Sequence, residues 1–215
     1  MAAHIAAAHP RLDVLINNAG VGLGGRFGIP RELSRDGHAL RFQVYYLAPV
    51  LLTRRLLPLL VAAAPARIVN VAARGQAAID FYDVMLERGF DGFRAYRQCK
   101  LALVMATFDL AAELAESGVT VNALHPGSLL DTNIVREAFG EACGDADEEA
   151  AAEVALATAA EFDGVSGCFF DQTTEARALD QAYDEEARRR LREFTDRLIG
   201  EVWLKWGASL RSLSR

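Results

Sequence analysis

The chain has 215 residues, of which 52% are hydrophobic and 24% are charged, which predicts one soluble globular domain and argues against disorder. A formal net charge of −6 provides no basic surface for nucleic acid or an anionic membrane, so the expected partner is a small molecule or another protein. Three scattered cysteines predict no disulfide framework and no metal site; without an export signal or membrane span, a cytoplasmic location is expected.

Short apolar runs bounded by turn residues are typical of strands buried on both faces of a sheet. Helical stretches alternate with these runs. The alternation predicts an α/β fold with a parallel sheet, right-handed crossovers and helices on both faces. The expected strands are residues 12–17, 66–73, 119–127 and 167–171.

Two long helices are expected between the first three strands. The first spans residues 34–64, with Ser34 as its N-cap and a kink at Pro49. The second spans residues 94–118 and ends with Gly118 as its C-cap.

The C-terminal part of the chain is charged. An acidic helix is expected to start within "DADEEAAAE", residues 145–153, and a charged amphipathic helix is expected over residues 176–199. The tail, residues 201–215, contains Trp203 and Trp206 among basic residues. It is interpreted as an extension that covers the sheet or a subunit interface, with a membrane-surface contact as the alternative.

Gly20, Gly22 and Gly25 have the G-x-G-x-x-G spacing of a dinucleotide-binding fingerprint. That motif works where the glycine turn opens directly into a helix, whose N-terminal N–H groups hold the pyrophosphate. Here Gly28 and Pro30 follow, and no helix is expected before about residue 35. The glycines are therefore interpreted as a loop.

Three further motifs follow strands or lie on a helix, and their order along the chain is informative. "NNAG" occupies residues 17–20, Y-x-x-x-K occurs as "YRQCK" at 96–100, and "HPG" occupies 125–127. In this order the sequence resembles the short-chain dehydrogenase/reductase family, and most of all its retinol-dehydrogenase-like branch. The resemblance implies a truncated Rossmann-like sheet, equivalent to family strands 4 to 7, in one incomplete domain over residues 1–200 followed by the extension 201–215.

In that family the phosphate-binding glycine motif lies well upstream of NNAG. The resemblance therefore implies that the nucleotide-binding half is absent, so no cofactor is expected for this chain alone. It also implies that the NNAG strand forms an exposed apolar edge. A homo-oligomer, a partner chain, a rearranged N-terminal helix or the tail around Trp203 and Trp206 would have to cover it.

Tyr96 and Lys100 are four residues apart, so their side chains share one helix face. An ammonium group beside a phenol favours the phenolate and moves its pKa from about 10 toward neutrality, which suits acid–base catalysis. The alternative is an ordinary pair on a helix surface. The resemblance implies that these two residues are catalytic.

Two catalytic positions of the family are replaced. The family's serine corresponds to Ala73 and its helix asparagine to Tyr45, and loss of the serine hydroxyl removes an electrophilic donor worth about a hundred- to thousandfold in rate. Tyr45, Ala73 and His125 are assigned to a substrate pocket, with a structural role as the alternative for His125. The resemblance further implies dinucleotide contacts, or a reassigned substrate pocket, for Asn18, Ala19, Gly20, Gly127 and Thr132.

Three functional hypotheses remain. The first is an enzyme acting on a carbonyl or hydroxyl compound by Tyr/Lys acid–base chemistry without hydride transfer, as an isomerase, lyase or cyclase. The second is an NAD(P)-dependent oxidoreductase whose nucleotide-binding half is missing from this chain or supplied by another. The third is a catalytically inactive binding protein.

Overall fold

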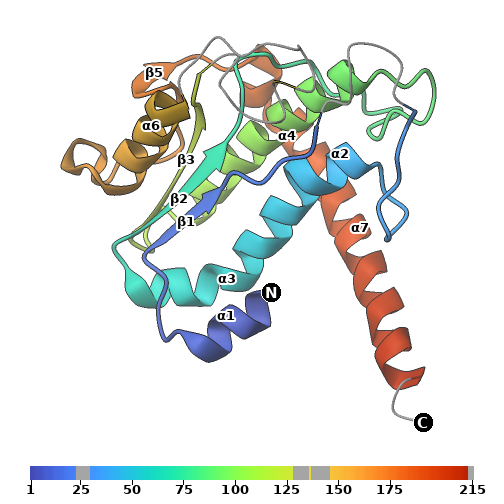
Figure 1. Cartoon of the computed structure of the whole chain (residues 1–215), viewed down its shortest axis with the longest axis horizontal. Coiled ribbons are helices and arrows are strands. Elements are labelled where there is room, and N and C mark those ends of the chain that lie inside the picture. The colour runs from blue at the N-terminus through green and yellow to red at the C-terminus, as the bar shows by residue number, and fades with distance from the viewer. Residues whose placement is uncertain (23–29, 128–135, 137–145, 213–215) are drawn as a thin grey trace.

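The computed structural model describes residues 1–22, 30–127, 136 and 146–212 (Figure 1). Its centre is a five-stranded sheet in the order β1-β2-β3-β4-β5. Strands β1 to β4 are parallel, whereas β5 is antiparallel to β4. The strands are β1 (Val14–Asn17), β2 (Ala66–Val71), β3 (Val119–His125), β4 (Phe169–Asp171) and β5 (Thr174–Ala176).

The predicted α/β fold is confirmed, with one correction at the edge of the sheet. The sheet is mixed and not fully parallel, because the antiparallel strand β5 was not predicted. Strand β5 has three residues, "TEA", and its burial is low. So short a polar segment carries no apolar run by which a buried strand is recognised.

Helices cover both faces of the sheet, as predicted (Figure 1). Ile68 of β2 packs in a cluster with Leu60 of α3 and Leu114 at the end of α4. Its neighbour Val69 points to the other face, where it packs in a cluster with Leu156 of α6. The helices around the sheet are α1 (Ala2–Ala8), α3 (Ala48–Ala63), α4 (Gly92–Glu113), α6 (Ala146–Thr158) and α7 (Glu185–Ser212).

The helix expected from Ser34 begins later, at Leu40. Gly37 adopts a φ of +87° and turns the chain, and the Ser34 hydroxyl accepts a hydrogen bond from the His38 N–H at 3.3 Å within this turn. Ser34 is therefore not the N-cap. The residue that precedes the helix is Ala39.

The helix is irregular just before Pro49. It runs as α2 (Leu40–Phe42), a π-helical segment (Gln43–Leu47) and then α3. Proline has no N–H to bond the carbonyl four residues earlier, so the irregularity coincides with the position where an ordinary helical bond is lost. This segment carries Tyr45 and Tyr46.

Residues Leu40–Ala63 are long and apolar enough to cross a bilayer, judged by length and composition alone. In the structure α3 packs against α1, β1, β2 and α4. One third (33%) of this apolar window is buried in that packing. Leu56 and Leu60 are fully buried in that packing.

Helix α4 begins at Gly92, where the Asp91 carboxylate caps it by accepting the Arg94 N–H at 2.6 Å. It ends at Glu113, so the prediction that Gly118 is its C-cap is wrong. Gly118 has a φ of +75° in the turn that leads into β3, and a side chain there would meet Ala64. The glycine is needed by the turn and not by the helix end.

The predicted helix over 176–199 begins at Glu185. Ala176 belongs to β5, and a 3-10 turn (Asp180–Tyr183) separates this strand from α7. The Asp184 carboxylate accepts the N–H groups of Glu186 and Ala187, which fixes the start of the helix. Helix α7 then continues without interruption to Ser212, across the predicted boundary at residue 200.

Strand β1 is an edge strand, as predicted from the resemblance. Its one neighbour in the described sheet is β2, and Ile16 is 37% exposed. The side chains of Trp203 and Trp206, which were considered as a cover for this edge, are outside the described residues.

Candidate active site

The predicted motifs meet at one edge of the sheet. Parallel strands β1, β2 and β3 end at Asn17, Val71 and His125, and the residues that follow them lie at the carboxyl ends of the strands. In open parallel sheets this edge is where ligands bind. Helix α4 packs on β2 and β3 and brings Tyr96 and Lys100 to them.

The Lys100 ammonium group is held by one carbonyl and two aromatic rings. Its Nζ donates to the Val71 carbonyl oxygen at 2.6 Å, and the residue is 6% exposed. The same Nζ lies 4.8 Å from the ring centroid of Tyr45 and 5.6 Å from that of Tyr96. Contacts of this kind stabilise the charged ammonium. The predicted Tyr96/Lys100 pair is thus brought together, with Tyr45 as a third member.

The two tyrosines differ in what they can do. Their rings meet edge to face, with centroids 5.2 Å apart and planes at 82°. The Tyr45 hydroxyl donates to the Val21 carbonyl, and burial raises the Tyr45 pKa to about 12. Tyr45 therefore stays protonated and acts as a donor to the loop after β1. Tyr96, by contrast, is only half-buried.

Arg41 was not predicted as part of the site. It lies one helical turn before Tyr45, is 2% exposed, and donates to the Gly22 carbonyl at 3.1 Å. Its other terminal nitrogen lies 3.5 Å from the Glu32 carboxylate. Arg41 and Tyr45 therefore hold the consecutive carbonyls of Val21 and Gly22. A charged residue inside an apolar helical run was the signal that could have identified it.

The position of the family's serine carries no hydroxyl. Ala72 and Ala73, which follow β2, are 3% and 5% exposed. The Ala73 carbonyl accepts the Gln76 side-chain N–H at 2.8 Å, while the Gln76 amide oxygen accepts the Leu179 N–H. Gln76 is thus used to tie this loop to the C-terminal region.

His125 lies at the end of β3. Burial lowers its pKa, and the nearby Asp171 carboxylate opposes that shift. Asp171 is also paired with Arg74 at 2.8 Å. The imidazole is accordingly neutral at neutral pH, and it lies in the electrostatic field of Lys100.

The structure describes four of the five residues that the resemblance assigns to a dinucleotide. The Asn18 side chain donates to the Glu153 carboxylate of α6 at 3.2 Å, so it turns toward the sheet face opposite α4. Ala19 and Gly20 are exposed, Gly127 is half-buried with a φ of +155°, and Thr132 lies outside the described residues. Glu153 is a contact that sequence reasoning missed.

The described part of the segment after β1 offers no helix N-terminus to a dinucleotide phosphate. Residues 18–22 and 30–39 contain no helix, and the first helix after β1 in the described chain begins at Leu40. The described glycines Gly20 and Gly22 thus have no helix N-terminus directly behind them to hold a pyrophosphate. This holds for residues 18–22 and 30–39, and the rest of the loop lies outside the described residues.

Other reactive groups of the region are inactive or absent. Burial raises the pKa of the Cys99 thiol to about 12, which makes it a packed side chain and not a nucleophile. No group of three or more His, Cys, Asp or Glu side chains among the described residues is arranged to hold a metal ion.

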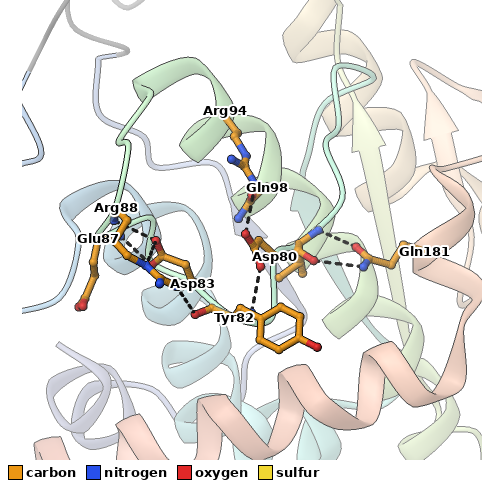
Figure 2. A network of polar contacts seen from close by, with 9 residues as sticks. Asp80, Tyr82, Asp83, Glu87, Arg88, Arg94, Gln98 and Gln181 are labelled. Carbon is orange, nitrogen blue, oxygen red and sulfur yellow. Dashed lines mark hydrogen bonds and ion pairs between the residues drawn. The ribbon is translucent and has the colours of Figure 1, made fainter.

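A network of polar contacts fixes the loop that leads from β2 into α4 (Figure 2). The Gln181 amide exchanges two hydrogen bonds with the backbone of Ile79, at 2.6 and 3.3 Å. Asp80 lies 3.6 Å from Arg94, which in turn donates to Gln98 at 3.2 Å. Arg94 and Gln98 flank Tyr96 on α4, so this network ties the loop to the turn of helix that carries the candidate catalytic phenol.

Comparison with known proteins agrees with this geometry. Residues 1–142 match the family model described as short chain dehydrogenase. Human retinol dehydrogenase 13 is 37% identical over 216 residues, covering 93% of this chain and 64% of the relative. Human retinol dehydrogenase 14 is 35% identical over 208 residues, covering 89% of this chain and 60% of the relative. The chain thus spans less than two thirds of the length of these relatives.

Solved structures show the same fold. The carbonyl reductase Sniffer of D. melanogaster superposes with a TM-score of 0.60 at 23% identity, covering 83% of this chain and 71% of that chain. The NADPH-bound carbonyl reductase from chicken fatty liver gives a TM-score of 0.55 at 24% identity over the same shares. With its motifs at one sheet edge and its sequence matched over most of its length, the chain belongs to the short-chain dehydrogenase family.

Proposed function

We propose that this chain catalyses proton transfer at the oxygen of a carbonyl or hydroxyl compound, without transferring a hydride itself. The observation that carries the proposal is the Lys100 ammonium, bound to the Val71 carbonyl at 2.6 Å and facing the ring of Tyr96. The reaction is an isomerisation, elimination or cyclisation. The names of the retinol dehydrogenase relatives support an alcohol or carbonyl compound as the substrate.

Tyr96 is the group that moves the proton in this mechanism. As a phenol it donates its proton to the carbonyl oxygen of the substrate, while solvent water takes a proton from the neighbouring carbon and the enol forms. As a phenolate it takes the proton back from the enol oxygen while water returns a proton to carbon, so that the tyrosine is restored at the end of the cycle. Lys100 keeps its positive charge beside the phenolate and lowers the energy of that state.

The absence of the serine hydroxyl limits the chemistry. Ala73 cannot donate a hydrogen bond to the substrate oxygen, so Tyr96 is left as the hydroxyl donor among the residues that the motif supplies. Hydride transfer depends on strong polarisation of the carbonyl. The loss of one donor therefore weighs against hydride transfer.

Deuterium exchange tests the proposal without knowledge of the natural substrate. The purified chain is incubated in D2O with a panel of aldehydes and ketones that includes retinal, and incorporation of deuterium at carbon is followed by NMR. We expect exchange of at least one panel member to fall by about a hundredfold or more in Tyr96→Phe. Tyr82→Phe is the matched control, because Tyr82 is 89% exposed and outside the site. Equal exchange by the wild type and Tyr96→Phe would refute the assignment.

A second candidate function is an NAD(P)-dependent oxidoreductase whose nucleotide-binding half comes from residues outside this chain. It is favoured by the 60–64% coverage of the retinol dehydrogenase relatives and by the open edge of β1. Ala73 and Tyr45, at the positions of the family's serine and asparagine, weigh against it. This candidate predicts reduction of the same carbonyl panel when NADPH and the complementary half are supplied.

A further inference from the structure

A cavity of about 220 Å³ lies between α3, α4 and α7, apart from the candidate active site. It reaches from the surface of the helical layer to Asn70 of β2 in the central sheet. Ligand sites usually enclose about 300–1,000 Å³, so this cavity suits a molecule smaller than a drug. None of the motifs discussed above contributes to its wall.

The inner end of the cavity has unused hydrogen-bond donors. Thr53 and Asn70 both line it and are 3% and 5% exposed. The Thr53 hydroxyl accepts from Asn17 at 3.1 Å, but it donates to no acceptor within the described part of the chain. Asn70 donates one N–H to Thr107 at 2.9 Å, and its second N–H is not used by any described residue. Buried donors of this kind are costly unless a ligand or water oxygen accepts them.

The middle of the cavity is apolar. Leu103 and Met105 of α4 and Leu191 of α7 line it, and each is at most 2% exposed. Such walls favour a hydrocarbon chain over a polar molecule, because removing the chain from water is favourable. A string of ordered waters would find few partners there.

The mouth of the cavity is rich in arginine. Arg54, Arg188 and Arg192 line it, whereas its carboxylates are Asp109 and the exposed Glu113. Arg188 and Arg192 share the single Asp109 carboxylate, at 2.8 and 2.7 Å. Arg54 is paired with Asp196 at 2.6 Å, where both side chains are more than 40% exposed. Arg188 and Arg192 each contact Asp109 through one nitrogen, so both guanidinium groups keep N–H donors that a second anion can accept.

We propose that this cavity binds a medium-chain carboxylate that carries a hydroxyl or oxo oxygen at its far end. The far oxygen accepts from Thr53 and Asn70, the hydrocarbon chain lies along Leu103 and Leu191, and the carboxylate meets Arg192 and Arg188. This binding does not depend on Tyr96 or Lys100, so it stands or falls separately from the proposed acid–base activity.

The test is a calorimetric titration of the full chain with three probes. The first, 8-hydroxyoctanoate, has both polar ends. Octanoate lacks the far oxygen, and octane-1,8-diol lacks the carboxylate. We expect 8-hydroxyoctanoate to bind with one site per chain and each of the others to bind about fivefold to tenfold more weakly. Failure of the wild type to bind 8-hydroxyoctanoate at millimolar concentration would overturn the proposal.

Variants connect the binding to the two ends of the cavity. Thr53→Val should abolish the preference for 8-hydroxyoctanoate over octanoate, and Arg192→Gln should weaken both acids while sparing the diol. Arg189→Gln is the matched control for Arg192, because the two are on the same helix and 49% and 48% exposed, but Arg189 is outside the cavity.

Ala106→Leu covers the case in which Thr53→Val fails to fold. Ala106 lines the cavity, so a larger side chain fills it and should abolish binding of all three probes. Unchanged binding in Ala106→Leu, or an unchanged ratio between the two acids in Thr53→Val, would place the binding elsewhere and contradict the proposal.

Discussion

At the scale of single residues, Tyr45 contributes both a ring and a hydroxyl to the candidate site. At this position, to which the resemblance assigns the family's asparagine, a tyrosine ring packs against the Lys100 ammonium and the ring of Tyr96. The hydroxyl of the same side chain holds the loop at Val21. Tyr45 is therefore a positioning residue, since it acts through Lys100 and through the loop.

Two substitutions separate the roles of the Tyr45 ring and its hydroxyl. Tyr45→Phe keeps the ring beside the ammonium, and we expect a loss of about 1 kcal/mol in unfolding free energy with little change in deuterium exchange. Tyr45→Leu removes the cation–π contact, which is worth about 0.5–2 kcal/mol. The rate of deuterium exchange should fall about tenfold below that of Tyr45→Phe, and the pH profile of that rate should differ between the two variants. Identical exchange and pH profiles for the two variants would argue against a role of the ring.

His125 gives a pH dependence of stability at the same scale. Its folded pKa lies below the unfolded value of about 6.5, so the unfolded chain binds the proton more readily. The stabilisation from the neutral imidazole is present above pH 6.5 and is lost as the pH falls from there through the folded pKa.

We expect His125→Asn to flatten this part of the stability curve. Urea denaturation of both proteins between pH 7.5 and 5 measures the effect, and His4→Asn is the control because His4 is exposed on α1. Parallel curves for the wild type and His125→Asn would show that another group is responsible.

The candidate site was predictable where it rests on residues close in sequence. The i, i+4 spacing of Tyr96 and Lys100 places them on one helix face. The motifs that follow the strands were expected at the carboxyl edge of the sheet because parallel strands end there. The sequence marks Arg41 as a charge within an apolar run, but it does not show what Arg41 or Glu153 contacts. Their contacts with Gly22 and Asn18 depend on how α2 and α6 pack on the sheet, which no local pattern encodes.

At the scale of elements, a buried chain of polar side chains joins the sheet to its helices. Asn17 of β1 donates to Asn70 of β2 at 2.8 Å and to Thr53 of α3 at 3.1 Å, and Asn70 donates to Thr107 of α4 at 2.9 Å. The register that places Asn17 beside Asn70 makes this possible. These contacts fix α3 and α4 against the strands whose ends form the site.

Thr107→Val should destabilise the fold by about 1–3 kcal/mol, because it leaves an Asn70 N–H without its acceptor at a fully buried position. Urea denaturation measures the change. Thr158→Val is the matched control. The hydroxyls of Thr107 and Thr158 each donate to the carbonyl four residues earlier on their helix, but Thr158 is exposed. A change no larger than that of the control would mean that the polar chain does not hold these elements together.

Element types could be predicted from the sequence better than element ends. The strands were recognised because both faces of β2 and β3 are buried, which produces continuous apolar runs. The ends depended on turns: Gly37 delayed the first long helix, and Asp184 set the start of α7. Strand β5 was missed since its pairing with β4, and not its composition, makes it a strand.

At the scale of the whole molecule, the open edge of β1 is the feature with most consequence. The retinol dehydrogenase relatives are longer than this chain, which spans 60–64% of their length. In the described sheet, β1 pairs with β2 alone and leaves its other edge unpaired. Unpaired apolar edges favour pairing between chains.

We therefore expect the purified chain to self-associate through β1, and Ile16→Lys to reduce that association. A lysine on the edge strand opposes edge-to-edge pairing by charge and solvation. Sedimentation velocity over a range of concentrations measures the effect. Val61→Lys is the control, since Val61 is 43% exposed on α3. Association that responds equally to both substitutions would not involve the strand edge.

The central claim is that these 215 residues perform acid–base chemistry without binding a nucleotide of their own. Calorimetric titration of the folded chain with NADH and then NADPH tests it most directly. The account predicts no saturable heat from a sample that catalyses deuterium exchange at a carbonyl compound. Saturable binding with a Kd of micromolar order, about −8 kcal/mol, would contradict it and assign the site to hydride transfer.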